Sequence, residues 1–177
     1  MAGAVALCKS PPAGLDDSKK LTAKRRVALD EQVQGSCAWA VAIVHPEAID
    51  RLNIFAATML AMSLAVERLE DVCGVPVAHA LIDGNMTPQD RTQVWRWPAR
   101  ALVGGDALEP AISAASIVAK EWRDRLMIEA AGRFPGYGWE RNKGYGTAEH
   151  LQALRTHGIT PLHRRSFAPV AQQELPV

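Results

Sequence analysis

The sequence predicts an α/β protein in which short buried strands alternate with helices. Two observations lead to this prediction. Short apolar runs of small or β-branched residues recur along the chain, each bounded by turn signals. Between them, apolar residues recur at spacings of three and four, as on one face of a helix. Such an alternation favours a sheet covered by helices. With 177 residues, 48% of them hydrophobic, we expect one domain over residues 1–177, with a loose tail at 170–177.

Four strands and four helices are expected in order. The strands fall at residues 3–8, 37–44, 77–83 and 101–106. The helices fall at residues 22–35, 55–69, 113–132 and 147–158. Thr22 and Thr147 are suited to cap the first and fourth helices at their N-termini, and Gly158 to end the fourth. The second helix should pack one face on the sheet.

Composition excludes several classes of protein. Twenty basic and nineteen acidic side chains give a formal charge of +1, which identifies no partner. Cys8, Cys37 and Cys73 are odd in number and far apart, so we expect neither a disulfide framework nor structural zinc. We expect the protein to work in a reducing compartment. No apolar run approaches the roughly 20 residues of a membrane span. We therefore expect a cytoplasmic protein without membrane contact, and a monomer by default.

Two aspartates carry the strongest chemical signal. Asp83 and Asp106 each end an expected strand, beside glycine, so one sheet could bring both carboxylates to the same edge. Two like charges side by side are unfavourable without a cation, and Mg²⁺ or Mn²⁺ prefers such oxygen ligands. The alternative interpretation is that both are turn or cap residues, because Asp-Gly is a common turn dipeptide.

Three further segments could contact nucleic acid. In residues 16–20, Ser18 and Lys19 could donate to a phosphate, although a solvated helix N-terminus explains the same pattern. Tyr145 lies between glycines, where an exposed ring can stack on a sugar or base or can simply cover the core. Residues 163–167 are basic, and His163 could instead be a packing histidine. Glu70 and Asp71 are interpreted as a solvated pair on the second helix.

The order of these motifs resembles bacterial ribonuclease HII over nearly the whole chain. The motifs that carry the resemblance are GLDDSKKL at 14–21, LIDGN at 81–85, GGD at 104–106, SAASIVAK at 113–120, KGYGT at 143–147 and HRRSF at 163–167. The resemblance implies a ribonuclease H-like fold, with a central mixed sheet flanked by helices and a C-terminal helical region. It also implies endonucleolytic cleavage of RNA in RNA/DNA hybrids, including 5′ to a single ribonucleotide in duplex DNA, with two Mn²⁺ or Mg²⁺ ions.

The resemblance also implies roles for single residues. Asp83 and Asp106 match the family's third and fourth catalytic carboxylates, which are metal ligands. Lys19, with Ser18, matches its phosphate-contacting segment. Tyr145 matches the tyrosine that packs against the sugar next to the ribonucleotide. Asp124 matches an aspartate that we interpret as structural rather than as a metal ligand.

The sequence departs from the family at its start. The family opens with a strand carrying Asp-Glu-Ala-Gly-Arg-Gly, which supplies the first two carboxylates, whereas residues 1–5 align just after that motif. We therefore expect that the first strand is missing and that Met1 is an internal methionine of a longer protein. A chain with only Asp83 and Asp106 should cleave weakly or not at all. The alternative is a catalytically incomplete remnant that binds hybrid duplexes. A further small departure is Gly104, at a position that is usually lysine.

Overall fold

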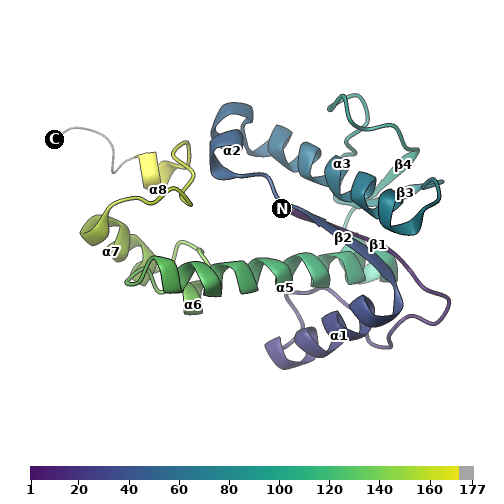
Figure 1. Cartoon of the computed structure of the whole chain (residues 1–177), viewed down its shortest axis with the longest axis horizontal. Coiled ribbons are helices and arrows are strands. Elements are labelled where there is room, and N and C mark those ends of the chain that lie inside the picture. The colour runs from purple at the N-terminus through teal and green to yellow at the C-terminus, as the bar shows by residue number, and fades with distance from the viewer. Residues whose placement is uncertain (172–177) are drawn as a thin grey trace. The chain divides into compact units, whose positions relative to one another are not determined.

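The computed structural model describes residues 1–171 and confirms the expected alternation of strands and helices (Figure 1). The elements along these residues are β1 (Ala2–Ala6), α1 (Ala23–Ser36), β2 (Ala38–Ala42), α2 (Pro46–Leu52), α3 (Ile54–Cys73), β3 (Ala80–Asp83), β4 (Ala99–Leu102), α4 (Gly105–Leu108), α5 (Pro110–Arg133), α6 (Trp139–Asn142), α7 (Ala148–His157) and α8 (Ala168–Ala171). The four expected strands and four expected helices are all present, whereas α2 and the short helices α4, α6 and α8 were not foreseen.

The chain divides into two compact units. Unit 1 comprises Met1–Ile43 and Thr58–Glu121, and unit 2 comprises Val44–Ala57 and Trp122–Val177. All four strands belong to unit 1, and α7 and α8 belong to unit 2. The expectation of a single domain stays a prediction.

Unit 1 contains both strand directions that a mixed sheet requires. β1 pairs with β2 antiparallel, with Ala4 opposite Ala40, and β3 pairs with β4 parallel, with Asp83 opposite Leu102. Over residues 1–171 these are two separate ladders, because the strand orders are β1-β2 and β3-β4. The strand expected ahead of Met1 lies outside the sequence and stays a prediction.

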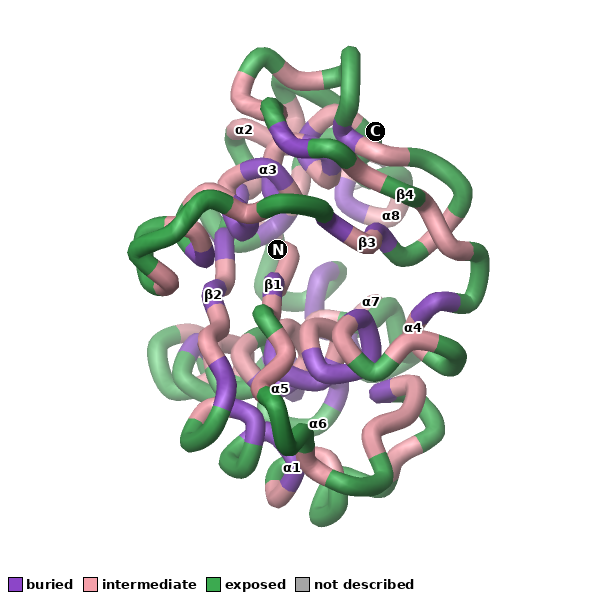
Figure 2. Tube along the Cα trace, turned by 90° about the vertical axis from the view of Figure 1, so that its right-hand side faces the viewer, coloured by how far each residue is buried: buried purple, intermediate pink, exposed green. Residues whose placement is uncertain are grey.

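The β1–β2 ladder is covered on both faces. One face joins α3 in a cluster of buried residues that includes Ala4, Ala40, Ala42, Val66 and Leu69. The other face packs against Val33 of α1 and against Ala114 and Val118 of α5. Strand residues therefore alternate between two packed environments, and in β2 buried and half-buried residues alternate from Trp39 to Ala42 (Figure 2).

Gly3 sets how closely β1 approaches α5. A Cβ at this position would lie 2.6 Å from the carbonyl oxygen of Ala115 and 3.1 Å from the Cβ of Ala119. Only glycine allows two backbones to come this close. The small side chains of the SAASIVAK segment thus serve close packing of the helix on the strand.

Helix ends follow the expected capping chemistry. The hydroxyl of Thr22 accepts from the backbone N–H of Arg25 at 3.3 Å, and the hydroxyl of Thr147 accepts from that of His150 at 3.3 Å. Gly158 ends α7, with its N–H donating to the carbonyl of Leu154. The unexpected helix α2 begins with Pro46 and Glu47, which are favoured in a first turn. These caps confirm the expected starts of two helices within a residue.

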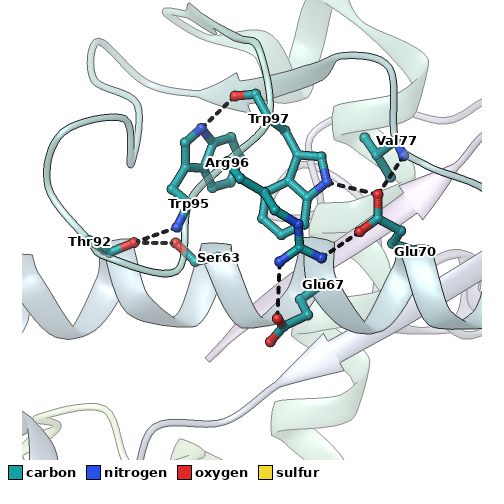
Figure 3. A network of polar contacts seen from close by, with 8 residues as sticks. All are labelled: Ser63, Glu67, Glu70, Val77, Thr92, Trp95, Arg96 and Trp97. Atoms are coloured by element: carbon teal, nitrogen blue, oxygen red, sulfur yellow. Dashed lines mark hydrogen bonds and ion pairs between the residues drawn. The ribbon is translucent and has the colours of Figure 1, made fainter.

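Glu70 is not the solvated residue that the sequence suggested. Its carboxylate accepts from the indole N–H of Trp97 at 3.0 Å, from the backbone N–H of Val77 at 2.9 Å and from the guanidinium of Arg96 at 2.6 Å (Figure 3). These hydrogen bonds, that from Trp97 first, lower the pKa of Glu70. Its neighbour Asp71 is exposed, as expected. Glu70 therefore anchors the connection ahead of β4 onto α3.

Two other expectations are corrected. Cys8 and Cys37 form a disulfide, because the antiparallel register that sets Ala6 opposite Ala38 brings these residues together although they are 29 apart in sequence. The cysteines therefore no longer argue for a reducing compartment. The predicted tail at 170–177 is wrong for its first two residues, since Val170 is buried in α8. Residues 172–177 lie outside the described residues.

A buried ion pair joins α1 to α5. The guanidinium Nε of Arg26 lies 2.5 Å from a carboxylate oxygen of Glu121, and the two side chains are 11% and 7% exposed. The Nη1 atom of Arg26 also donates to the carbonyls of Ser18 at 3.1 Å and Leu21 at 3.4 Å. Arg26 therefore fixes the loop at residues 16–21 against the body of unit 1.

We expect Glu121→Ala to lower the free energy of unfolding by about 3 kcal/mol or more, because it removes the buried carboxylate that lies 2.5 Å from the Arg26 guanidinium. Urea denaturation followed by circular dichroism measures the loss. Glu129→Ala is the matched control, since Glu129 is exposed on the same helix. A double variant, R26M with E121L, should lose less than Glu121→Ala alone. Equal losses for the Glu121 and Glu129 variants would contradict the buried-pair interpretation.

Candidate active site

Asp83 lies at the carboxyl end of β3, as the sequence predicted. It is the last residue of the strand and its side chain is exposed. Gly84 follows with φ +106°, a conformation that favours glycine, and its N–H donates to the carbonyl of Leu102 at 2.9 Å. The turn therefore continues the parallel ladder by one bond and holds the aspartate at the sheet edge.

Asp106 is placed differently from the sequence expectation. β4 ends at Leu102, and Asp106 lies in the first turn of α4 rather than at the end of a strand. Gly104, with φ +67°, turns the chain from strand to helix. The hydroxyl of Ser113 donates to the carbonyl of Asp106 at 2.7 Å, which ties α4 to α5. The SAASIVAK motif thus fixes the backbone of the second aspartate.

Gly105 packs closely between α5 and Asp83. A Cβ on Gly105 would lie 2.5 Å from the side chain of Ile112 and 3.5 Å from the Oδ1 atom of Asp83. A side chain here would therefore displace Ile112, while its contact with the Asp83 carboxylate would be an ordinary one. Gly105 thus serves the close packing of α4 on α5 next to the two aspartates.

A third carboxylate, Asp17, joins this pair, and our sequence analysis did not assign it. The pKa of Asp106 is raised above its ordinary value by burial first, then by the negative charges of Asp83 and Asp17. Asp17 also accepts the backbone N–H of Lys19 at 2.9 Å. The signal that could have found it is the second aspartate of the GLDDSKKL motif. Asp17, Asp83 and Asp106 therefore form an acidic cluster in unit 1.

Ser18 and Lys19 differ in their access to solvent. The side chain of Lys19 is 79% exposed, and its Nζ lies 4.0 Å from Oδ2 of Asp106. Ser18 is buried at 6% exposure. Of the two predicted phosphate donors, only Lys19 presents an exposed side chain, and its ammonium pairs with Asp106 of the acidic cluster.

The donor set of the acidic cluster fits a divalent cation in its chemistry. Carboxylate oxygens are hard ligands, and the pKa of Asp106 is raised by burial first and then by the charges of Asp83 and Asp17, a repulsion that a cation would relieve. Within residues 1–171, however, no three His, Cys, Asp or Glu side chains are arranged so that together they could hold a metal ion. The cluster thus has the right chemistry without a full ligand set.

Tyr145 belongs to unit 2, in the loop between α6 and α7. Tyr145 is 55% exposed, whereas Tyr137, which lies between Gly136 and Gly138, is 4% exposed and packs in the core. The N–H of Tyr145 donates to the carbonyl of Asn142 at 2.9 Å, and the N–H of Thr147 donates to the carbonyl of Tyr145 at 2.8 Å. The side chain of Asn142 accepts the N–H of Gly144 at 2.8 Å. The loop is therefore ordered by its own backbone while it presents an aromatic surface.

His163 proves to be a packing histidine. It is 7% exposed, with its ring beside those of Tyr137, Trp139 and His150. Burial, and then the neighbouring His150, lower the pKa of His163 to about 4. The basic stretch at 163–167 therefore begins with a neutral side chain at physiological pH. The N–H groups of Arg165 and Ser166 in this stretch both donate to the carboxylate of Asp50, at 2.9 Å each.

Comparison with known proteins decides the family. The family model described as Ribonuclease HII matches residues 4–170. The chain belongs to the ribonuclease HII family. It is 64% identical over 175 residues to the ribonuclease HII of Erythrobacter litoralis, covering 99% of this chain and 82% of that protein. It is 64% identical over 177 residues to that of Novosphingobium aromaticivorans, covering 99% and 90%.

Solved structures agree on the ribonuclease HII fold. The ribonuclease H2 of Pyrococcus horikoshii superimposes with a TM-score of 0.72 at 20% identity, over 91% of this chain and 80% of that one. Bst-RNase HIII in complex with Mn²⁺ gives 0.72 at 17% identity, over 90% and 57%. At such identities the likeness concerns the fold alone, and it confirms the predicted ribonuclease H-like α/β class.

Membership of the ribonuclease HII family confirms the expected enzyme class. The chain is a ribonuclease H-type hydrolase, and the reaction of its family is cleavage of RNA in RNA/DNA hybrids. The family depends on divalent metal ions. No helix within residues 1–171 is long and apolar enough to cross a membrane. The roles of Asp83, Asp106, Ser18, Lys19 and Tyr145 stay predictions.

We expect Asp106→Asn to raise the melting temperature when metal is removed with EDTA. Folding raises the pKa of Asp106, so the folded protein loses stability as pH rises through that pKa. At neutral pH the charge on Asp106 is therefore destabilising. Added Mn²⁺ should raise the melting temperature of the wild type and have little effect on the variant. Asp71→Asn, an exposed site on α3, is the control. A lower melting temperature for Asp106→Asn in EDTA would contradict the proposed repulsion.

We expect stability to fall with acidification because of His163. Its folded pKa of about 4 lies below the ordinary 6.5, so the unfolded chain binds the extra proton. The stability that neutral His163 contributes is complete above pH 6.5 and is lost as pH falls towards 4. The free energy of unfolding should fall by about 2 kcal/mol between pH 7 and pH 5. Urea denaturation across this range measures the slope. His163→Gln should flatten it, and His79→Asn, at an exposed site, should leave it unchanged. Equal slopes for all three proteins would refute the assignment.

Proposed function

We propose that this chain hydrolyses phosphodiester bonds of RNA in RNA/DNA hybrids and also cuts on the 5′ side of a single ribonucleotide embedded in duplex DNA. The observation that carries the proposal is the approach of Asp83 and Asp106 at the carboxyl ends of the parallel strands β3 and β4, within a member of the ribonuclease HII family. Ligands of phosphate chemistry commonly bind at this edge of a parallel sheet.

Asp83 and Asp106 are proposed as the residues that hold Mg²⁺ or Mn²⁺. When bound, two such ions supply an activated water and stabilise the leaving oxygen. The contribution of the chain is a pair of carboxylates, one at the end of β3 and one on α4, whose backbone is anchored through Ser113. Mn²⁺ is the first ion to test, since the related Bst-RNase HIII has been solved with Mn²⁺.

Lys19 is proposed as the principal phosphate contact. Its exposed ammonium lies beside Asp106, so a phosphate bound there would be close to the proposed metal ligands. The loop that carries it is held by Arg26 and by the bond from its own N–H to Asp17. Ser18 would act through its backbone rather than its buried side chain. Such contacts position the duplex and do not read its sequence.

Tyr145 is proposed to pack against the sugar beside the ribonucleotide. The support is its exposed ring in a loop whose backbone is ordered. An aromatic face binds sugars and bases regardless of sequence. Discrimination of RNA from DNA must rest on the 2′-hydroxyl, because only RNA has it.

We further propose that the chain works as a monomer in the cytoplasm, the compartment that holds the DNA of bacteria such as its relatives.

The test uses a labelled DNA duplex that contains one ribonucleotide, with an all-DNA duplex of the same sequence as the substrate control. We expect slow cleavage 5′ to the ribonucleotide in Mn²⁺, because Asp83 and Asp106 supply only two of the family's four carboxylates, with none of the all-DNA duplex and none in EDTA. Asp83→Asn should reduce the rate by about 100-fold or more, because a metal ligand is lost.

Asp71→Asn is the matched control variant, because it removes one exposed carboxylate of unit 1 outside the acidic cluster. It should cleave as the wild type does. Hybrid binding without cleavage in either ion, or cleavage that is insensitive to Asp83→Asn, would overturn the proposal.

A further inference from the structure

His150 contacts the backbone of Tyr145 from inside α7. Its Nδ1 atom lies 3.0 Å from the carbonyl oxygen of Tyr145. The same carbonyl accepts the N–H of Thr147, at 2.8 Å. His150 is 6% exposed, whereas Tyr145 is 55% exposed. A buried side chain thus holds the main chain of the residue whose ring faces solvent.

The hydrogen-bond partners fix the tautomer of His150. A carbonyl oxygen can only accept, so Nδ1 of His150 carries the proton. The indole N–H of Trp139 can only donate, and it lies 3.0 Å from Nε2 of His150. The Nε2 atom is therefore unprotonated. His150 is consequently neutral, with its one proton directed at Tyr145.

His163 fixes the same arrangement from the other side. The backbone N–H of Thr160 donates to Nδ1 of His163 at 2.9 Å, so Nε2 of His163 carries the proton. That Nε2–H lies 3.2 Å from Nε2 of His150, whose single lone pair it shares with the indole N–H of Trp139. A directed chain of hydrogen bonds therefore runs from Thr160 through His163 and His150 to the carbonyl of Tyr145. A second proton on either ring would set two donors against each other.

The chain of hydrogen bonds links two segments that are distant in sequence. Tyr145 lies in the KGYGT motif, and His163 opens the HRRSF motif. Trp139, His150 and His163 are all buried, at 1%, 6% and 7% exposure. Packing alone would be satisfied by apolar side chains of similar volume, which would avoid the cost of burying polar atoms. The polar chain therefore has a use beyond filling the core of unit 2.

We propose that His150 is a positioning residue for substrate recognition: its Nδ1–H holds the backbone of Tyr145 so that the ring meets the sugar at the RNA–DNA junction, and His163 keeps His150 in the required tautomer. This inference rests on the function proposed for Tyr145. It makes the fit of the duplex depend on two side chains that never touch it.

Two conservative variants separate positioning from packing. The amide nitrogen of asparagine can occupy the place of Nδ1, so His150→Asn keeps the donor to Tyr145. The longer glutamine reaches the place of Nε2, so His150→Gln keeps the partner of Trp139 and His163 and loses that donor. On the single-ribonucleotide duplex, His150→Gln should raise KM about tenfold, the typical effect of one lost hydrogen bond, while His150→Asn stays near the wild type. kcat should change little in either.

The background of Tyr145→Ala provides the control for a route through Tyr145. If His150 acts through that ring, adding His150→Gln to Tyr145→Ala should raise KM no further. Additive effects, or equal KM values for His150→Asn and His150→Gln in the wild-type background, would overturn the positioning role. Melting temperatures of the two variants show whether each folds.

A spectroscopic measurement tests the arrangement without catalysis. Nitrogen-15 NMR of the histidine rings should show His150 protonated at Nδ1 and His163 at Nε2 at pH 7. Amide exchange at residues 144–147 should be faster in His150→Gln than in His150→Asn. A wild type with these tautomers that binds no hybrid would overturn the proposed function. A wild type that binds and cuts hybrid, but carries the His150 proton on Nε2, would overturn the positioning role alone.

Discussion

The parallel pairing of β3 with β4 is the constraint on which the candidate active site depends. Parallel strands end at the same edge of a sheet, so residues that follow each of them converge. Asp83 uses that edge directly, while Asp106 reaches it from a short helix that begins after a left-handed glycine. The arrangement is unfavourable for the carboxylate of Asp106, whose pKa is raised by burial first and then by the charges of Asp83 and Asp17. The packing around the site offsets this cost, here through Gly105 against Ile112 and through the hydrogen bond from Ser113.

Recognition of the duplex, as proposed, depends on features of another kind. Lys19 is exposed, but its loop is fixed by a buried arginine. Tyr145 is exposed, but its backbone is held by a buried histidine. In each case an exposed side chain belongs to a residue whose backbone is held by a buried side chain. The contact group can then adjust to a nucleic acid while the position of its Cα stays fixed.

Local signals in the sequence predicted much of the fold. Thr22 and Thr147 cap helices because the partner N–H lies three residues away, and such short-range chemistry can be read from the sequence. Asp83 followed from an apolar run that ends on Asp-Gly. Asp106 was expected at the end of a strand but lies in the first turn of α4. The residues GGD fit the end of a strand and the start of a helix equally well. Short helices such as α6 give too little periodicity to be recognised.

Features that depend on distant partners were not predictable. Glu70 looks solvated beside Asp71 until the chain returns with Trp97. Cys8 and Cys37 look unpaired until the register of β1 and β2 is known. Asp17 acquires a chemical environment only when its loop lies against Asp106. Residue patterns and the family resemblance supplied the candidate residues, whereas the surroundings of these residues required coordinates.

The bonds made by Arg26 have a consequence for local unfolding. One guanidinium holds the carbonyls of Ser18 and Leu21 and the carboxylate of Glu121, so loop 16–21, α1 and the first half of α5 share a single buried anchor. Segments that share such an anchor open together as one cooperative unit rather than separately. The loop that carries Lys19 should therefore open as rarely as α1 and α5 do, and less often than an ordinary surface turn.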